Sequence, residues 1–203
     1  MLDRALLGWL RPPLHGAALR LAAVGVSADA VTLCGLACGL AAAVAIAFSQ
    51  PLPGLALIAA SRLADGLDGE LARATAATDR GAFLDITLDF LFYAAIPLAF
   101  ALADPPANAL PAAVLLAAFI GTGSSFLAFA VLAERRGLKS TGYPAKGFFY
   151  LGGLTEGTET IACFALMCLM PQLFAWWAYG FAALCALTIV TRLVAGWVIF
   201  GTR

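Results

Sequence analysis

Residues 65–89 read DGLDGELARATAATDRGAFLDITLD, and this short stretch is unlike the rest of the chain. Over the 203 residues, 63% are hydrophobic and 12% are charged, and 8 of the 24 charged residues (12 Lys or Arg and 12 Asp or Glu) lie in these 25 positions. Soluble domains carry about 25% charged residues. The composition therefore predicts a polytopic membrane protein whose charges are concentrated at one place.

Outward from this stretch, turn signals divide the chain into apolar segments that are each long enough to cross the ~30 Å hydrocarbon core. We expect six spans, at about 28–48, 54–77, 81–102, 107–133, 147–170 and 173–200. Residues 2–22 interleave leucines with arginines, which predicts a helix lying on the membrane surface. The expected fold is all-α: a six-helix transmembrane bundle with an N-terminal amphipathic surface helix.

Basic residues alternate between the connections of this bundle. They occur in the N-terminal segment, the second and fourth connections and the C-terminus, as Arg4, Arg11, Arg20, Arg73, Arg80, Arg135, Arg136, Lys139, Lys146 and Arg203. The positive-inside rule then places both termini in the cytoplasm. A net charge of zero gives no reason to expect nucleic-acid binding. The five cysteines all fall in apolar runs, where they act as small hydrophobic residues.

The carboxylates of the opening stretch are spaced to share helix faces. Asp65 and Asp68 are three residues apart, and Asp85 and Asp89 are four apart on the next helix. Because a short connection makes these helices antiparallel neighbours, the acidic faces can meet. Each charge in the apolar region costs about 2.5–3.5 kcal/mol, so cations must balance the cluster. Oxygen ligands suit Mg²⁺, Mn²⁺ or Ca²⁺, and two such ions, shared with a substrate diphosphate, would balance four carboxylates.

These residues form a longer motif that resembles a known signature. The pattern is Asp65-x-x-Asp68-Gly69-x-x-Ala72-Arg73, followed by Gly81-x-x-x-Asp85-x-x-x-Asp89. It resembles the signature of the CDP-alcohol phosphatidyltransferases, and the span layout extends the resemblance over residues 1–203 as a single membrane domain. Seven residues separate Arg73 from Gly81 where the usual pattern has eight, which shortens the connection but leaves the carboxylate spacing intact.

The resemblance implies an activity and a role for each motif residue. Such enzymes transfer a phosphatidyl group from a CDP-linked donor, by default CDP-diacylglycerol, to an alcohol and release CMP, in phospholipid biosynthesis. It implies that Asp65, Asp68 and Asp85 ligate two Mg²⁺ or Mn²⁺ ions, and that Asp89 touches a metal and acts as the general base. By the same resemblance, donor binding falls to the remaining motif residues: Gly69, Ala72, Gly81 and Arg73. It also implies a homodimer in a bacterial inner membrane, with its active site facing the cytoplasm.

Other polar residues allow two interpretations each. Glu156 and Glu159, in the fifth predicted span, either line the acceptor pocket or pair with Arg62 or Arg192. Thr32 is a candidate for donor binding, in a segment where helix capping by Ser27 is the simpler explanation. Asp89 itself could instead pair with Arg62 on the facing helix.

Arg135 and Lys146 lie near the same cytoplasmic mouth and mainly reflect topology. If they also bind substrate, the acceptor carries a phosphate, as in glycerol 3-phosphate or inositol phosphate. Two other functions compete with this one. A metal-dependent prenyl-diphosphate transferase would need a second aspartate-rich motif, and a divalent-cation transporter would need acidic residues along a path across the bilayer.

Overall fold

The structure is a computed structural model that describes residues 2–138 and 155–201, and every regular element in that part of the chain is a helix. The elements are α1 (Leu2–Ala23), α2 (Ala28–Ala47), α3 (Pro51–Ala74), α4 (Asp79–Ala103), α5 (Pro105–Arg135), α6 (Gly157–Leu169), the 3₁₀ helix η1 (Pro171–Leu173) and α7 (Phe174–Gly201). The all-α prediction is confirmed. The predicted boundaries agree closely, except that part of the fifth segment lies outside the described residues.

Four of these helical stretches are long and apolar enough to cross a membrane: Ala28–Ala47, Asp79–Ala103, Pro105–Arg135 and Pro171–Gly201. Helix α3 has the length, with 24 residues, but it carries the charged residues of the opening motif. Helix α6 as described has 13 residues. The six-span count therefore stays a prediction, whereas a multi-pass membrane protein agrees with the four apolar helices.

Local sequence signals explain where the helices begin. The Ser27 hydroxyl accepts a hydrogen bond from the backbone N–H of Ala30 (3.2 Å), so Ser27 is the N-cap of α2. Thr78 caps α4 in the same way through the N–H of Gly81 (3.0 Å). Such caps satisfy backbone donors that the first helical turn leaves unpaired. The cap at Thr78 ends the connection from α3 and starts the helix that carries Asp85.

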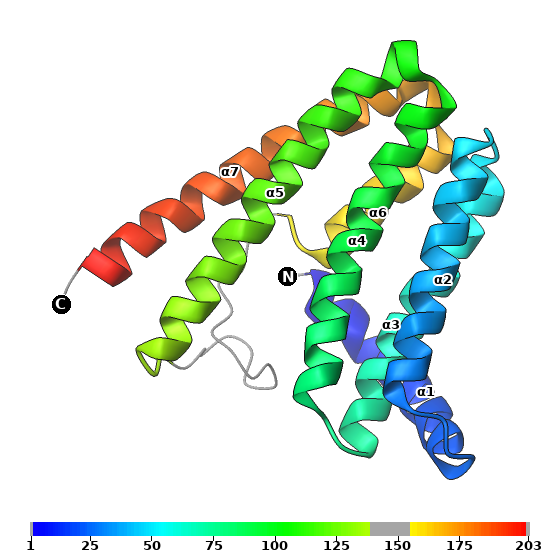
Figure 1. The fold of residues 1–203 in the computed structure, drawn as a ribbon, viewed down its shortest axis with the longest axis vertical. Helices are drawn as coiled ribbons and strands as arrows, with labels where there is room; N and C mark the ends of the chain where they lie inside the picture. The colour runs from blue at the N-terminus through cyan, green and yellow to red at the C-terminus, as the bar shows by residue number, and fades with distance from the viewer. Residues whose placement is uncertain (1, 139–154, 202–203) are drawn as a thin grey trace.

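The helices form two groups (Figure 1). Helix α2 packs against both α3 and α4, α1 packs on α3, and the long helices α5 and α7 lie side by side, joined to the first group through α4 and α6. A Cβ built on Gly35 of α2 would lie 3.1 Å from Cβ of Ala64, and one on Gly39 would lie 2.6 Å from the Phe92 ring. Two glycines one turn apart therefore bring α2 close to α3 and α4 together, which positions the acidic stretch.

The main apolar core contains residues of α2 to α7, and aromatic rings of α4 pack there against rings of α6 and α7. Phe92 meets Phe164 edge to face at a centroid distance of 6.1 Å, and Phe100 stacks on Phe174 at 4.8 Å. A smaller cluster of Ala18, Val31 and Leu71 joins α1, α2 and α3. Phe92 is 1% exposed, and so it holds α4 rigidly against the core just below the acidic residues.

Candidate metal and substrate site

The charged stretch surrounds a cavity between α3 and α4, with α2 closing one side. Most of the polar residues that line it belong to the predicted motif. The lining residues are Thr32, Gly35, Leu36, Ser61, Arg62, Asp65, Asp68, Asp85, Leu88, Asp89 and Phe92. The structure thus brings together all four predicted aspartates, and it adds Thr32, which also donates a hydrogen bond to the carbonyl of Ala28 (3.0 Å).

Three of the aspartates form a compact group of oxygen ligands. One carboxylate oxygen from each of Asp65, Asp68 and Asp85 lies within 4.8 Å of the others. Asp68 is 5% exposed, and its buried Oδ2 accepts no hydrogen bond. A buried carboxylate oxygen without a donor costs at least about 1–3 kcal/mol unless a cation binds it. An all-oxygen set of this kind fits a hard divalent ion such as Mg²⁺ or Mn²⁺.

Asp89 lines the same cavity but has a different partner. Its Oδ1 accepts a hydrogen bond from Nη1 of Arg62 at 2.7 Å, and the same Nη1 lies 3.6 Å from Oδ1 of Asp65. The ion pair between Asp89 and Arg62, one of the two alternatives considered from the sequence, is therefore present. The compact oxygen group consists of the other three aspartates, so a metal contact for Asp89 remains a prediction.

Apolar and polar contacts hold Arg62 inside the cavity. Its side chain is 18% exposed, its guanidinium carbon lies 4.1 Å from the centroid of the Phe92 ring, and Nη2 donates to the Ser61 hydroxyl at 3.2 Å. A guanidinium over an aromatic face is favourable by about 0.5–2 kcal/mol. From the sequence, Arg62 was predicted only as an ion-pair partner of Asp89 or of the glutamates. In the structure it also lines the cavity.

The small residues of the motif, Gly69, Ala72 and Gly81, follow Asp68 on α3 and precede Asp85 on α4, and they do not line the cavity. A Cβ on Gly69 would lie 3.4 Å from Nη2 of Arg73, and one on Gly81 would lie 3.2 Å from the Thr78 hydroxyl and 3.4 Å from Oδ1 of Asp29. Ala72 is half-buried on α3, three residues after Gly69. A Cβ at Gly81 would be tight against the Thr78 hydroxyl, whereas one at Gly69 would make ordinary contact with Arg73, so the roles of both glycines in donor binding stay predictions.

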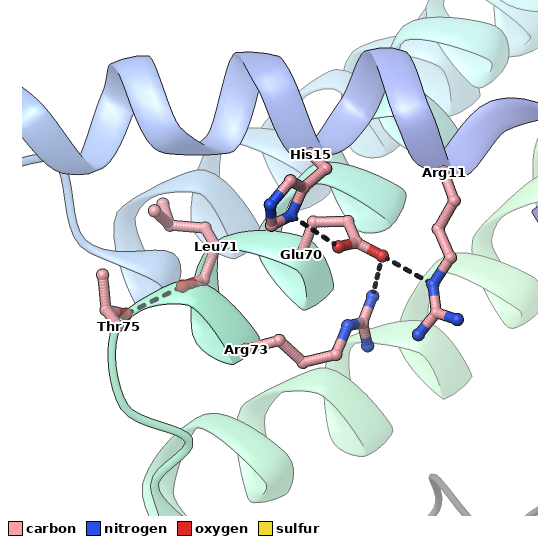
Figure 2. Close-up of polar contacts among 6 residues, drawn as sticks. All are labelled: Arg11, His15, Glu70, Leu71, Arg73 and Thr75. Carbon is pink, nitrogen blue, oxygen red and sulfur yellow. Dashed lines mark hydrogen bonds and ion pairs between the residues drawn. The ribbon is translucent and has the colours of Figure 1, made fainter.

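Arg73 belongs to a cluster of charges that sequence reasoning did not find (Figure 2). Glu70, whose side chain is 6% exposed, accepts hydrogen bonds from Arg73 Nη2 (2.7 Å) and Arg11 Nε (3.0 Å), and His15 Nδ1 lies 3.4 Å from its other oxygen. Arg11 and His15 come from α1, so Glu70 fastens the N-terminal helix to α3. The one signal in the sequence was the spacing of three residues between Glu70 and Arg73.

The glutamates of the fifth segment are found at a helix start. Glu156 is the N-cap of α6 and Glu159 its third residue, and together they form a capping box in which Glu159 Oε2 accepts from the backbone N–H of Glu156 (3.2 Å). Arg192 donates to the carbonyl of Thr122 (2.9 Å). Arg135 is exposed in the last turn of α5. Lys146 lies outside the described residues.

Comparisons with known proteins agree with this geometry. The family model for CDP-alcohol phosphatidyltransferase matches residues 26–191. The chain is 52% identical to the inner membrane protein YnjF of Escherichia coli (strain K12) over 197 residues, which cover 97% of this chain and 96% of YnjF.

Among solved structures, the chain is similar to the phosphatidylinositol phosphate synthase PgsA1 of Mycobacterium tuberculosis. With CDP-DAG bound, PgsA1 matches at a TM-score of 0.72 and 22% identity, over 91% of this chain and 93% of that one. Its complex with manganese and citrate matches at 0.70 and 22%, over 91% and 88%. These structures share the fold of the chain over 91% of its length.

Proposed function

The chain belongs to the CDP-alcohol phosphatidyltransferase family and is an enzyme of that class, and from this premise we propose that it transfers a phosphatidyl group from CDP-diacylglycerol to an alcohol with release of CMP. The observation that carries the proposal is the group of three carboxylates within 4.8 Å, one of them with a buried oxygen that lacks a donor. The membership of the family favours phosphatidyl transfer over the prenyl-diphosphate and cation-transport alternatives.

Asp65, Asp68 and Asp85 are the residues that would hold Mg²⁺ or Mn²⁺. A divalent ion at this position supplies positive charge to the donor diphosphate and to the leaving CMP. The manganese complex of PgsA1 supports this choice of metal. The number of ions, two by the charge balance of four carboxylates, is part of the proposal.

The residues of the chain account for the proton and the orientation of the substrates. The acceptor hydroxyl oxygen attacks the phosphorus that carries the lipid, its new P–O bond forms as the bond to CMP breaks, and Asp89 takes the hydroxyl proton. With Arg62 bound to Oδ1 of Asp89, as in this structure, Oδ2 is the oxygen available for that proton. We propose that Arg73, beside Gly69 at the cytoplasmic edge, pairs with a donor phosphate, with Ala72, Gly81 and Thr32 shaping the donor site.

The identities of the donor and of the acceptor rest on separate observations. CDP-DAG is bound in the PgsA1 structure, which supports the lipid donor. We propose a phosphate-bearing acceptor, glycerol 3-phosphate or inositol phosphate, because the sequence between the predicted fourth and fifth spans carries the basic residues Arg135 and Lys146. Glu156 and Glu159 are the remaining candidates for the acceptor pocket, beside their role in capping α6.

We further propose that the protein is a homodimer in the bacterial inner membrane. Four apolar helices and the similarity to an inner membrane protein of E. coli support the location. The alternation of basic connections supports cytoplasmic termini and an active site that opens to the cytoplasm.

The test measures CMP release from CDP-diacylglycerol by purified protein in detergent, with Mn²⁺ or Mg²⁺ and a panel of alcohols that includes glycerol 3-phosphate and inositol phosphate. We expect release that needs both metal and one alcohol and that disappears in Asp89→Asn. Glu134→Gln, an equivalent charge loss at the exposed end of α5, should keep full activity. Folded protein that releases no CMP with any alcohol would contradict the assignment of the lipid donor.

A further inference from the structure

Arg62 is a cation that the chain itself places among the four aspartates. With the carboxylates ionised, the cavity holds four negative charges and one positive charge, a formal sum of −3. A substrate or a divalent ion that enters this cavity therefore binds next to the Arg62 guanidinium. The position of this side chain decides where further cations can bind.

The contacts of Arg62 divide the aspartates into two overlapping sets. Its Nη1 bridges Asp89 (2.7 Å) and Asp65 (3.6 Å), whereas Asp65, Asp68 and Asp85 form the compact oxygen group. Asp65 belongs to both sets. One cation position thus lies among the three clustered carboxylates, and a second lies between Asp65 and Asp89, where the guanidinium is found.

The guanidinium is held at this second position from two sides. The Phe92 ring packs against its carbon at 4.1 Å, and the Ser61 hydroxyl accepts from Nη2 at 3.2 Å. Phe92 is fixed in turn because it is 1% exposed and lies against Gly39 of α2. A side chain ordered by its surroundings loses little further entropy when it pairs with a carboxylate, so its ion pair is difficult to displace.

We propose that Arg62 is a built-in cation that occupies the position between Asp65 and Asp89 and competes there with a second divalent ion. The inference rests on the proposed function, and it deepens it: the clustered aspartates bind one ion readily, and a second ion enters only when Arg62 leaves Asp89. The guanidinium lies between the two carboxylates that would hold the second ion, and two cations at that position repel each other at short range. Since binding linkage is reciprocal, each cation weakens the other by the same factor.

The experiment measures Mn²⁺ binding directly and needs neither donor nor acceptor. Metal-free protein in detergent is titrated with Mn²⁺, free Mn²⁺ is counted by its electron paramagnetic resonance signal, and a spin-coupled pair reports two ions in contact. Arg62→Gln removes the charge and keeps hydrogen-bonding groups. Arg62→Lys keeps the charge, and Arg20→Gln removes an equivalent charge from the exposed face of α1.

We expect wild type and Arg20→Gln to bind one ion tightly. Their affinity for a second ion should be at least 5-fold lower than that of Arg62→Gln, because coupling free energies of this kind typically change affinity 5–150-fold. The coupled-pair signal should appear at lower Mn²⁺ in Arg62→Gln. The Mn²⁺ affinities of Arg62→Lys should stay close to those of wild type. If Arg62→Gln does not fold, Arg62→Lys serves as the test instead. It would contradict competition if it bound the second ion as tightly as the first.

Two results would overturn the inference, and they differ from a failure of the proposed function. Equal numbers and affinities of ions in wild type and Arg62→Gln would show that Arg62 does not compete, even if both proteins release CMP. Failure of the folded wild type to bind any Mn²⁺ would overturn this inference together with the metal part of the proposed function.

Discussion

Replacing Glu70 with Gln should loosen the N-terminal helix from the rest of the protein. The Glu70 side chain is 6% exposed and lies between Arg11 and His15 of α1 and Arg73 of its own helix (Figure 2). Gln keeps the shape and one acceptor oxygen but removes the negative charge. The guanidinium groups of Arg11 and Arg73 would then face each other across an uncharged amide.

The magnitude follows from the exposure of the partners. A hydrogen bond to a charged group contributes about 1.5–3 kcal/mol when both partners are buried. Arg11, His15 and Arg73 are 55%, 54% and 50% exposed, so each regains water when its bond is lost. We therefore expect a net loss of about 1–2 kcal/mol, which lowers the ratio of docked to undocked α1 by about 5–30-fold.

Hydrogen exchange measured by mass spectrometry checks this value. Backbone amides of residues 11–23 should exchange about 5–30-fold faster in Glu70→Gln, while α4 is unchanged. Wild type at 1 M salt should shift in the same direction, because the Debye length falls to about 3 Å and the exposed cations are screened. Glu134→Gln is the matched control. Unchanged exchange of α1 in Glu70→Gln would refute the reasoning and show that the apolar contacts of Ala18 and Leu71 are sufficient.

Three further substitutions separate the roles assigned above. Asp68→Asn should weaken Mn²⁺ binding more than tenfold and reduce CMP release to background, and an unchanged Mn²⁺ affinity would contradict the metal site. Gly39→Ala should lower the free energy of unfolding by about 1–3 kcal/mol in thermal or denaturant unfolding, because its Cβ would lie 2.6 Å from Phe92; Gly180→Ala, with nothing within 4 Å, should show no such loss. Glu159→Ala should lower stability by about 0.5–2 kcal/mol through the lost cap and leave the acceptor KM unchanged, whereas a raised KM would place it in the acceptor pocket.

Much of the fold is readable from the sequence because its signals are local. The predicted segment at 28–48 is found as Ala28–Ala47 and that at 81–102 as Asp79–Ala103, since apolar runs and capping residues set both boundaries. The role of α2 could not be predicted in the same way. Its two glycines lie in a run of small apolar residues, and only the packed structure shows that they bring α2 close to both α3 and α4.

In the candidate site too, contacts set by local spacing could be predicted, and contacts that depend on helix packing could not. The spacing of Asp65, Asp68 and Asp85 on two neighbouring helices was sufficient to predict that their carboxylates meet. Glu70 was missed because its partner Arg11 lies 59 residues away, and such a pairing depends on how α1 docks. Glu156 was interpreted as an intramembrane carboxylate since the sequence does not show that α6 begins at the next residue.

Phe92 belongs to two environments at once, because the Arg62 guanidinium lies over its ring and the same ring meets Phe164 edge to face in the apolar core. This aromatic ring is therefore a direct contact between the charged cavity and the apolar core. Substitutions in the apolar core that shift Phe92 can therefore move Arg62 in the cavity without changing any polar residue. Adaptation of the enzyme to another metal or temperature thus has a route through hydrophobic positions that a survey of the motif alone would overlook.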